Sequence, residues 1–214
     1  MNYNAIKLTA PIKDYLWGGT RLKTDFGKVT DKEKAAESWE LSTHPDGESI
    51  VSGGEFDGMT LSQYIKANGG DECIGTRAAE FDFFPILIKL IDAKDNLSIQ
   101  VHPNDEYAMR VEGEYGKTEM WYIVDCEDDA YLYYGVNRDI TKLEFEERIK
   151  NNTLLEILNK VPVKKAMYFS FRQVLFMRYA QVYLFAKYSK IQTLPIVSMT
   201  MTDAVLTENH VSYT

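Results

Sequence analysis

The first 165 residues combine short apolar runs with polar turns, which is the pattern of a β-rich domain. Residues 37–42, Glu-Ser-Trp-Glu-Leu-Ser, alternate in polarity as a half-buried strand does. Four more strands are predicted from apolar runs at residues 6–11, 84–92, 97–101 and 120–124. Asp46-Gly47 and Gly53-Gly54 mark turns between strands. The pattern therefore predicts a mostly β fold with a few short helices.

Capping boxes indicate where helices interrupt the strands. Thr60 and Gln63 have the spacing of a capping box, so a short helix is predicted to start there and to end near Gly69 and Gly70. Residues 139–160 are predicted to be helical as well. Two further capping boxes lie in this stretch, Thr141 with Glu144 and Thr153 with Glu156.

The character of the sequence changes after Lys165. All 13 glycines lie at or before Gly135, so the final 49 residues, 166–214, contain none. A domain of short strands needs glycine at its turns, because glycine adopts positive φ without a steric cost. Residues 167–187 follow no steady period of 2 or 3.6. We therefore divide the chain into an incomplete β domain at 1–165 and an anomalous tail at 166–214.

Two interpretations of this tail are open. One is a hydrophobic C-terminal helix or hairpin. The other is a frameshift, in which the third base of each codon is read with the first two bases of the next. From Ala166 onward this alternative frame can encode Asp-Val-Phe-Phe-Ile-Pro-Ala-Gly-Thr-Val-His-Ala-Ile. It restores glycine, strand alternation and a histidine near the codons of Phe176 and Met177, so the sequence favours the frameshift.

Composition and charge narrow the classes of function. The 214 residues carry a net charge of −8 at pH 7, which argues against a nucleic-acid binder because basic patches would meet strong acidic competition. Cys73 and Cys126 lie far apart, as is typical of reduced thiols. There is neither a signal-peptide pattern nor an uncharged stretch long enough for a bilayer. We expect a soluble cytoplasmic protein without nucleic-acid or membrane partners.

The strongest candidate for chemistry is the segment Leu-Ser-Ile-Gln-Val-His-Pro at 97–103. On an extended strand Gln100 and His102 point to the same face, so an amide oxygen and an imidazole nitrogen can reach one metal ion. Glu119, at the start of the next predicted strand, can add a carboxylate. Such a ligand set suits Zn²⁺ or a similar divalent ion. Spacing alone is also consistent with a polar outer strand face and an ordinary surface carboxylate.

Five segments, in this order, resemble type I mannose-6-phosphate isomerase (phosphomannose isomerase) in its shorter bacterial form. They are 15–19 (YLWGG), 37–42 (ESWELS), 84–93 (FPILIKLIDA), 97–103 (LSIQVHP) and 116–122 (GKTEMWY). That family has a cupin-type jelly-roll β-barrel and uses zinc to interconvert mannose 6-phosphate and fructose 6-phosphate. The resemblance, which extends to about Lys165, implies the same fold and activity, with an incomplete barrel, Zn²⁺ as cofactor and a sugar phosphate as substrate.

The resemblance also implies roles for individual residues. The first three zinc ligands would be Gln100, His102 and Glu119. The substrate site would be lined by Lys89, Ser98 and Lys117, and Lys117 would also be catalytic. Trp17 would either stack on the sugar or close the core. The family's fourth ligand, a histidine in a Pro-Ala-Gly-Thr-x-His segment, and its catalytic arginine are absent from this frame, so we expect impaired activity.

Three alternatives to an isomerase are open. A non-catalytic cupin module would bind a sugar phosphate or a metal without turnover. A cupin enzyme of another class, such as an oxygenase, would depend on iron and oxygen, but such enzymes usually supply more histidines than the 3 of this chain. The chain could also fail to fold stably. Of those histidines, His44 has no partner ligand nearby in sequence and is interpreted as a structural loop residue, whereas His210 has no evident role.

Overall fold

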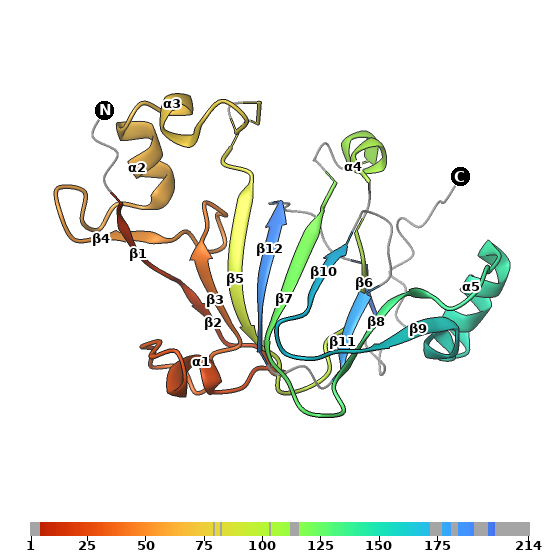
Figure 1. Ribbon diagram of the computed structural model, residues 1–214. Coiled ribbons are helices and arrows are strands. Elements are labelled where there is room, and N and C mark those ends of the chain that lie inside the picture. The colour runs from red at the N-terminus through yellow and green to blue at the C-terminus, as the bar shows by residue number, and fades with distance from the viewer. Residues whose placement is uncertain are drawn as a thin grey trace.

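The computed structural model describes residues 5–78, 80–81, 83–102, 104–111, 116–171, 177–180, 184–190 and 197–199. Its strands form two large antiparallel sheets and a two-stranded ribbon (Figure 1). The larger sheet has the order β10 (Tyr168–Phe171), β7 (Glu119–Asp125), β12 (Leu184–Lys190), β5 (Ile86–Asp92), β3 (Glu37–Leu41), β2 (Ile12–Lys13). The second has the order β13 (Val197–Met199), β6 (Ile99–Val101), β11 (Met177–Ala180), β8 (Tyr131–Val136), β9 (Leu158–Pro162). The ribbon pairs β1 (Lys7–Thr9) with β4 (Ile50–Ser52).

The architecture confirms the predicted mostly β fold and the five strands expected from the sequence. The half-buried strand at 37–42 is β3, and the apolar run at 84–92 contains β5. The other three are β1, β6 and β7, each within two residues of its predicted start. Alternation thus located β3, and apolar runs located the other four strands.

Six short helical elements connect the strands. They are α1 (Arg21–Thr24), α2 (Leu61–Ala67), α3 (Asp71–Ile74), α4 (Asp105–Val111), α5 (Lys142–Lys150) and the 3₁₀ helix η1 (Leu154–Ile157). The capping box before α2 is confirmed, because Thr60 and Gln63 each accept a backbone N–H of the other. The prediction of one helix over 139–160 is wrong at its end. Asn152 has φ 55, which interrupts the helix, and residues 158–162 form β9 instead.

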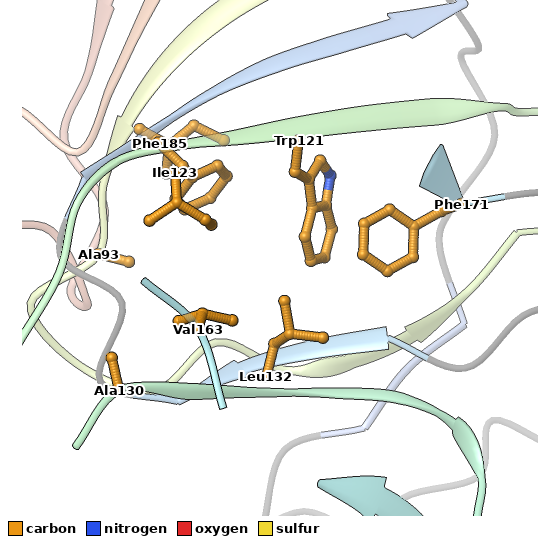
Figure 2. Close-up of a cluster of buried hydrophobic side chains, with 9 residues drawn as sticks. Ala93, Trp121, Ile123, Ala130, Leu132, Val163, Phe171 and Phe185 are labelled. Atoms are coloured by element: carbon orange, nitrogen blue, oxygen red, sulfur yellow. The ribbon is translucent and has the colours of Figure 1, made fainter. Parts of the chain in front are cut away.

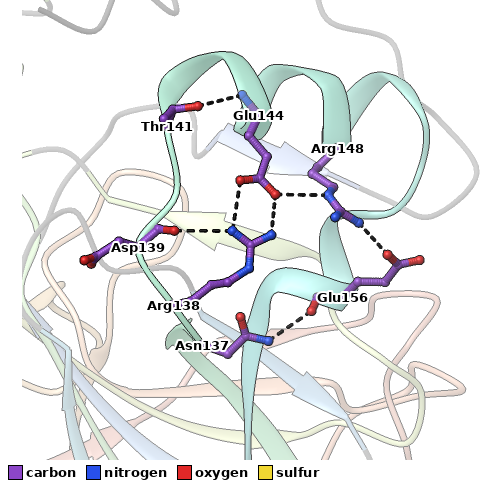
Figure 3. Close-up of polar contacts among 7 residues, drawn as sticks. All are labelled: Asn137, Arg138, Asp139, Thr141, Glu144, Arg148 and Glu156. Carbon is purple, nitrogen blue, oxygen red and sulfur yellow. Dashed lines mark hydrogen bonds and ion pairs between the residues drawn. The ribbon is translucent and has the colours of Figure 1, made fainter.

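In both predicted capping boxes at 139–160 the glutamate forms an ion pair with an arginine instead of closing the box (Figure 3). Thr141 accepts the backbone N–H of Glu144 at 3.2 Å, as predicted for the start of α5. The carboxylate of Glu144 binds Arg138 rather than completing the box. At η1 the predicted cap is wrong, because Thr153 makes no side-chain cap hydrogen bond and Glu156 pairs with Arg148.

The main hydrophobic core lies between the two large sheets. Figure 2 shows Trp121 and Ile123 of β7 and Phe185 of β12 pointing from the larger sheet toward Leu132 of β8. All four side chains are almost fully buried. Burying an aromatic or aliphatic side chain of this size contributes about 1.5–3 kcal/mol, so this cluster is a major source of stability. Both sheets are therefore needed to bury the strand faces that the sequence marks as apolar.

The segment after residue 165 contributes strands to both sheets. β10 and β12 pair with β7, and β12 also pairs with β5, so it lies inside the larger sheet. β11 and β13 pair with β6 in the second sheet. Residues 172–176, 181–183, 191–196 and 200–214, including His210, lie outside the described residues. The division at residue 165 and the frameshift concern the coding sequence and stay predictions.

Two expectations from composition concern the cysteines and membrane association. Cys73 and Cys126 are both free, as the sequence predicts. Within the described part of the chain, none of the helices has the length and apolar character needed to cross a membrane.

Candidate functional site

The inner face of the larger sheet changes from apolar to charged along its strands. Lys89 of β5 lies opposite Trp39 of β3 and opposite Lys187 of β12. Lys187 lies in turn opposite Trp121 of β7. Directly opposed residues share one face of a sheet, and Trp121 points into the core (Figure 2). Two lysines therefore lie on the inner face between two tryptophans.

Glu119, the first residue of β7, is the centre of this charged region. It precedes Trp121 by two residues and so points to the same inner face, where it is 1% exposed. One carboxylate oxygen, Oε2, accepts the indole N–H of Trp121 at 3.0 Å. The other, Oε1, lies near three nitrogens: His102 Nε2 at 3.2 Å, Lys117 Nζ at 3.0 Å and Lys187 Nζ at 2.6 Å.

The lysines keep Glu119 ionised despite its burial. Burial is the largest influence and by itself raises the pKa of Glu119. The positive charges of Lys117 and Lys187 more than offset it, so the pKa lies well below its ordinary value. The site therefore holds a carboxylate anion in an environment with little water.

His102 and Gln100 come from the strand β6 of the opposite sheet. His102 directly follows β6 and is 2% exposed, and burial lowers its pKa to about 4 although Glu119 partly opposes this. Its imidazole is consequently neutral near pH 7, with a lone pair available. Gln100 donates its side-chain N–H to the hydroxyl of Ser98 at 3.2 Å, which leaves the amide oxygen as an acceptor. The described contacts thus join His102 to Glu119, and Gln100 to Ser98.

Lys117 and Lys89 are two further buried cations of the site. Burial lowers the pKa of Lys117 to about 8, while Glu119 partly opposes the shift. Burial also lowers the pKa of Lys89, and Glu37 partly opposes it because its carboxylate lies 2.9 Å from the Lys89 amine. Glu37 accepts a second hydrogen bond from the indole N–H of Trp39 at 2.6 Å. Lys89 therefore has the carboxylate of Glu37 as its partner, and Lys117 has the carboxylate of Glu119.

The residues at Glu119 fit a divalent metal ion. Among the described residues, His102 Nε2 and Glu119 Oε1 are buried polar atoms that make no hydrogen bond of regular geometry, although Oε1 forms ion pairs with the amines of Lys117 and Lys187. Two ligands of one tetrahedral zinc ion lie about 3.4 Å apart, and these atoms are 3.2 Å apart. No three His, Cys, Asp or Glu side chains gather in the described part of the chain.

Trp17 lies at the other end of the larger sheet. Its neighbour Gly18 bridges Ala93, one residue beyond the end of β5, and a Cβ on Gly18 would come within 2.4 Å of Ala36. Trp17 packs against the main core and stacks on Tyr15 with ring centroids 5.3 Å apart. Across the sheet, Ala93 lies near Asp125 at the end of β7, whereas Glu119 is the first residue of that strand. The two ends of β7 are roughly 20 Å apart. The structure therefore does not bring Trp17 to the other predicted site residues, and its contact with sugar stays a prediction.

His44 has the structural role that the sequence suggested. Its Nδ1 accepts the backbone N–H of Asp46 at 3.1 Å, which closes the loop after β3. Its ring meets Trp39 edge-on, with centroids 5.5 Å apart. These contacts account for the burial of His44 without a metal.

Sequence reasoning missed Glu37 and Lys187. Glu37 could have been found, because alternation within β3 places it on the same face as Trp39. Lys187 had no such signal, since its segment lacks a clear period and its pairing with β5 and β7 spans much of the chain.

The two sheets and the charged residues between them define a cupin-type β-barrel protein with a polar site inside the barrel. The family model for the catalytic domain of phosphomannose isomerase type I matches residues 5–125, more than half of the chain. The chain therefore belongs to the phosphomannose isomerase type I family.

Known relatives agree with this assignment. The mannose-6-phosphate isomerase ManA of Bacillus subtilis is 42% identical over 158 residues, which cover 73% of this chain and 48% of the relative. The crystal structure of the mannose 6-phosphate isomerase from Bacillus subtilis matches with a TM-score of 0.77 and 33% identity, covering 86% of this chain and 58% of that one. A mannose 6-phosphate isomerase bound with zinc and yttrium shares the fold, with a TM-score of 0.62 and 16% identity over 86% of this chain and 67% of that one. The chain spans about half the length of the curated relatives it matches.

Proposed function

We propose that this protein has the site of a zinc-dependent isomerase that interconverts mannose 6-phosphate and fructose 6-phosphate. The observation that carries the proposal is the buried pair of His102 and Glu119, whose facing atoms lie 3.2 Å apart beside the amine of Lys117. The names of the relatives support the reaction, and the relative bound with zinc supports the metal.

Three side chains would hold the ion. Neutral His102 offers an imidazole nitrogen, ionised Glu119 offers a carboxylate oxygen, and Gln100 offers an amide oxygen. A bound zinc ion would supply Lewis-acid stabilisation of negative charge on the sugar oxygens. Isomerisation between an aldose and a ketose places negative charge on those oxygens while a proton moves between C1 and C2.

The charge of the site favours an anionic substrate. Its charged groups are Glu37, Glu119, Lys89, Lys117 and Lys187, whose side chains are at most 12% exposed. Two carboxylates and three amines give a net charge of about +1 before a metal binds. In our proposal Lys89, Lys117 and the hydroxyl of Ser98 hold the phosphate and sugar oxygens by hydrogen bonds. Lys117, 3.0 Å from Glu119, is the proposed catalytic group that exchanges a proton with the substrate.

We also propose that activity is impaired, because the described residues supply fewer ligands than the four of the family pattern. An alternative is a non-catalytic cupin module that binds a sugar phosphate or metal. The ion pair between Lys187 and Glu119 favours this second candidate, because it places a competing cation at a proposed ligand. The proposed setting is the cytoplasm, since the free thiols of Cys73 and Cys126 suit a reducing compartment.

A Glu119→Gln variant tests the proposal. It keeps the shape of the side chain but removes the anionic ligand, so any zinc-dependent conversion of mannose 6-phosphate should fall about 100-fold or become undetectable. A coupled assay of fructose 6-phosphate formation, with chelator-treated protein and added zinc, measures this.

Glu127→Gln is the matched control, because Glu127 lies on the exposed turn between β7 and β8. It should behave like the wild type. Conversion that survives both chelation and Glu119→Gln would contradict a zinc-dependent reaction at Glu119. Zinc binding that requires Glu119, without any conversion, would favour the binding module.

A further inference from the structure

Lys187 makes the shortest of the three contacts to Glu119 Oε1. Its amine lies 2.6 Å from this oxygen, compared with 3.0 Å for Lys117 and 3.2 Å for His102. Lys187 is 7% exposed and Glu119 is 1% exposed, so the ion pair is shielded from solvent. Its position is fixed by β12, which pairs with β5 on one side and with β7 on the other.

This ion pair uses the oxygen that a metal ion would need. His102 Nε2 and Glu119 Oε1 face each other at the separation expected of two ligands of one ion. A divalent ion bonded to Oε1 would lie beside the Lys187 amine, and like charges at such distances repel strongly where water is scarce. Lys117 also contacts Oε1, so this single oxygen already has two cationic partners. A metal ion bound to Oε1 therefore competes with the Lys187 contact.

We propose that, in the chain with the present reading frame, Lys187 is a cation that competes with a divalent metal ion for Glu119. The inference rests on the proposed function, because it takes His102 and Glu119 as the metal ligands. Without metal, Lys187 and Lys117 together neutralise the buried carboxylate of Glu119. With metal present, the same contact weakens binding, so the apparent affinity for zinc depends on a residue outside the ligand set.

The test is zinc binding to metal-free protein, measured by calorimetric titration with zinc chloride. Lys187→Met keeps most of the side-chain length and removes the charge, so zinc should bind about tenfold more tightly or better. Lys187→Arg keeps the charge and should bind zinc as weakly as the wild type. The exposed Lys164→Met is the matched control and should leave binding unchanged.

Thermal unfolding gives a second measurement on the same variants. Without zinc, Lys187→Met should melt below the wild type, because it leaves the Glu119 charge with fewer partners. Zinc should then raise its melting temperature more than it raises that of the wild type. If Lys187→Met does not fold, Lys187→Gln serves in both measurements.

The outcomes separate this inference from the proposed function. Equal zinc affinity in the wild type and in folded Lys187→Met, with binding still lost in Glu119→Gln, would overturn the role of Lys187 and leave the metal site intact. Zinc binding that Glu119→Gln does not change would overturn both, because the ion would then lie elsewhere.

Discussion

Two lysines of the site, Lys89 and Lys187, each lie over a tryptophan ring. The amine of Lys89 lies 4.2 Å from the centre of the Trp39 ring and pairs with Glu37. The amine of Lys187 lies 6.0 Å from the centre of the Trp121 ring. A buried ammonium group is costly unless opposite charge and polar contacts surround it, and an aromatic face adds a favourable cation–π contribution. The tryptophan rings and the carboxylates thus stabilise the positive charges of Lys89 and Lys187 inside the sheet.

His44 links the stability of the fold to pH. Burial lowers the pKa of His44 below its ordinary value of 6.5, while Asp46 partly opposes the shift. The folded state consequently binds fewer protons than the unfolded state below that pH. By linkage, the contribution of neutral His44 is fully present above about pH 6.5 and is lost progressively as the pH falls.

We expect His44→Asn to weaken this pH dependence. Asparagine can still accept the backbone N–H of Asp46 but does not titrate. The loss in unfolding free energy between about pH 7.5 and about pH 5.5, measured by urea denaturation, should be smaller in the variant. His102 is present in both proteins, so its own contribution cancels in the comparison. An equal loss in both proteins would show that His44 is not the titrating group.

At the scale of elements, β12 contributes to both the core and the site. It pairs with β5 and β7, and its residues 184–189 alternate between the two faces of the sheet. Phe185 enters the main core, Lys187 reaches Glu119, and Tyr188 lies on the outer face with 39% exposure. The same strand therefore stabilises the fold and delivers a charge to the site.

Substitutions on β12 test whether this strand lies in the sheet. Phe185→Ala should lower the unfolding free energy by about 3–5 kcal/mol, because it leaves a cavity beside Trp121. Tyr188→Ala on the same strand should cost about 1 kcal/mol or less, because its ring is on the outer face. Chemical denaturation of both variants measures the difference. Similar small effects at the two positions would mean that β12 does not pack as described.

At the scale of the whole molecule, the chain spans about half the length of its curated relatives, and the family model ends at residue 125. The segment after residue 165 lacks glycine yet supplies strands to both sheets. The lack of glycine favours a frameshifted segment, whereas the strand pairing favours a natural part of the protein. The coding DNA sequence can decide between them.

Resequencing the source DNA across the codons for Val163 to Met177 tests the frameshift. We expect a missing or added base, whose correction restores a Pro-Ala-Gly-Thr-Val-His segment. The corrected protein should bind zinc more tightly, because its added histidine can complete a four-ligand site. If the frame stands unchanged, the strands β10 to β13 belong to the natural protein, and little isomerase activity is expected even with added zinc.

Local sequence patterns predicted the positions of several strands and of one helix start. Alternation placed the strand that contains Trp39, apolar runs placed β5 and β7, and the box of Thr60 and Gln63 placed the start of α2. These signals work because strand faces repeat every two residues and a cap lies within one helical turn. The same reasoning failed at Thr153, where the carboxylate that should complete a box pairs with Arg148 on another element.

The sequence by itself also determined which residues carry the candidate chemistry, since Gln100, His102 and Glu119 could be named from spacing and resemblance. Only the tertiary structure decided which of them meet. It set His102 against Glu119 and brought Lys187 to the same carboxylate oxygen. The physical reason is that period fixes the face of a side chain within its own strand, whereas its partners depend on strand register across the sheets. That register is set by burial of the whole core, which no local segment of the chain encodes.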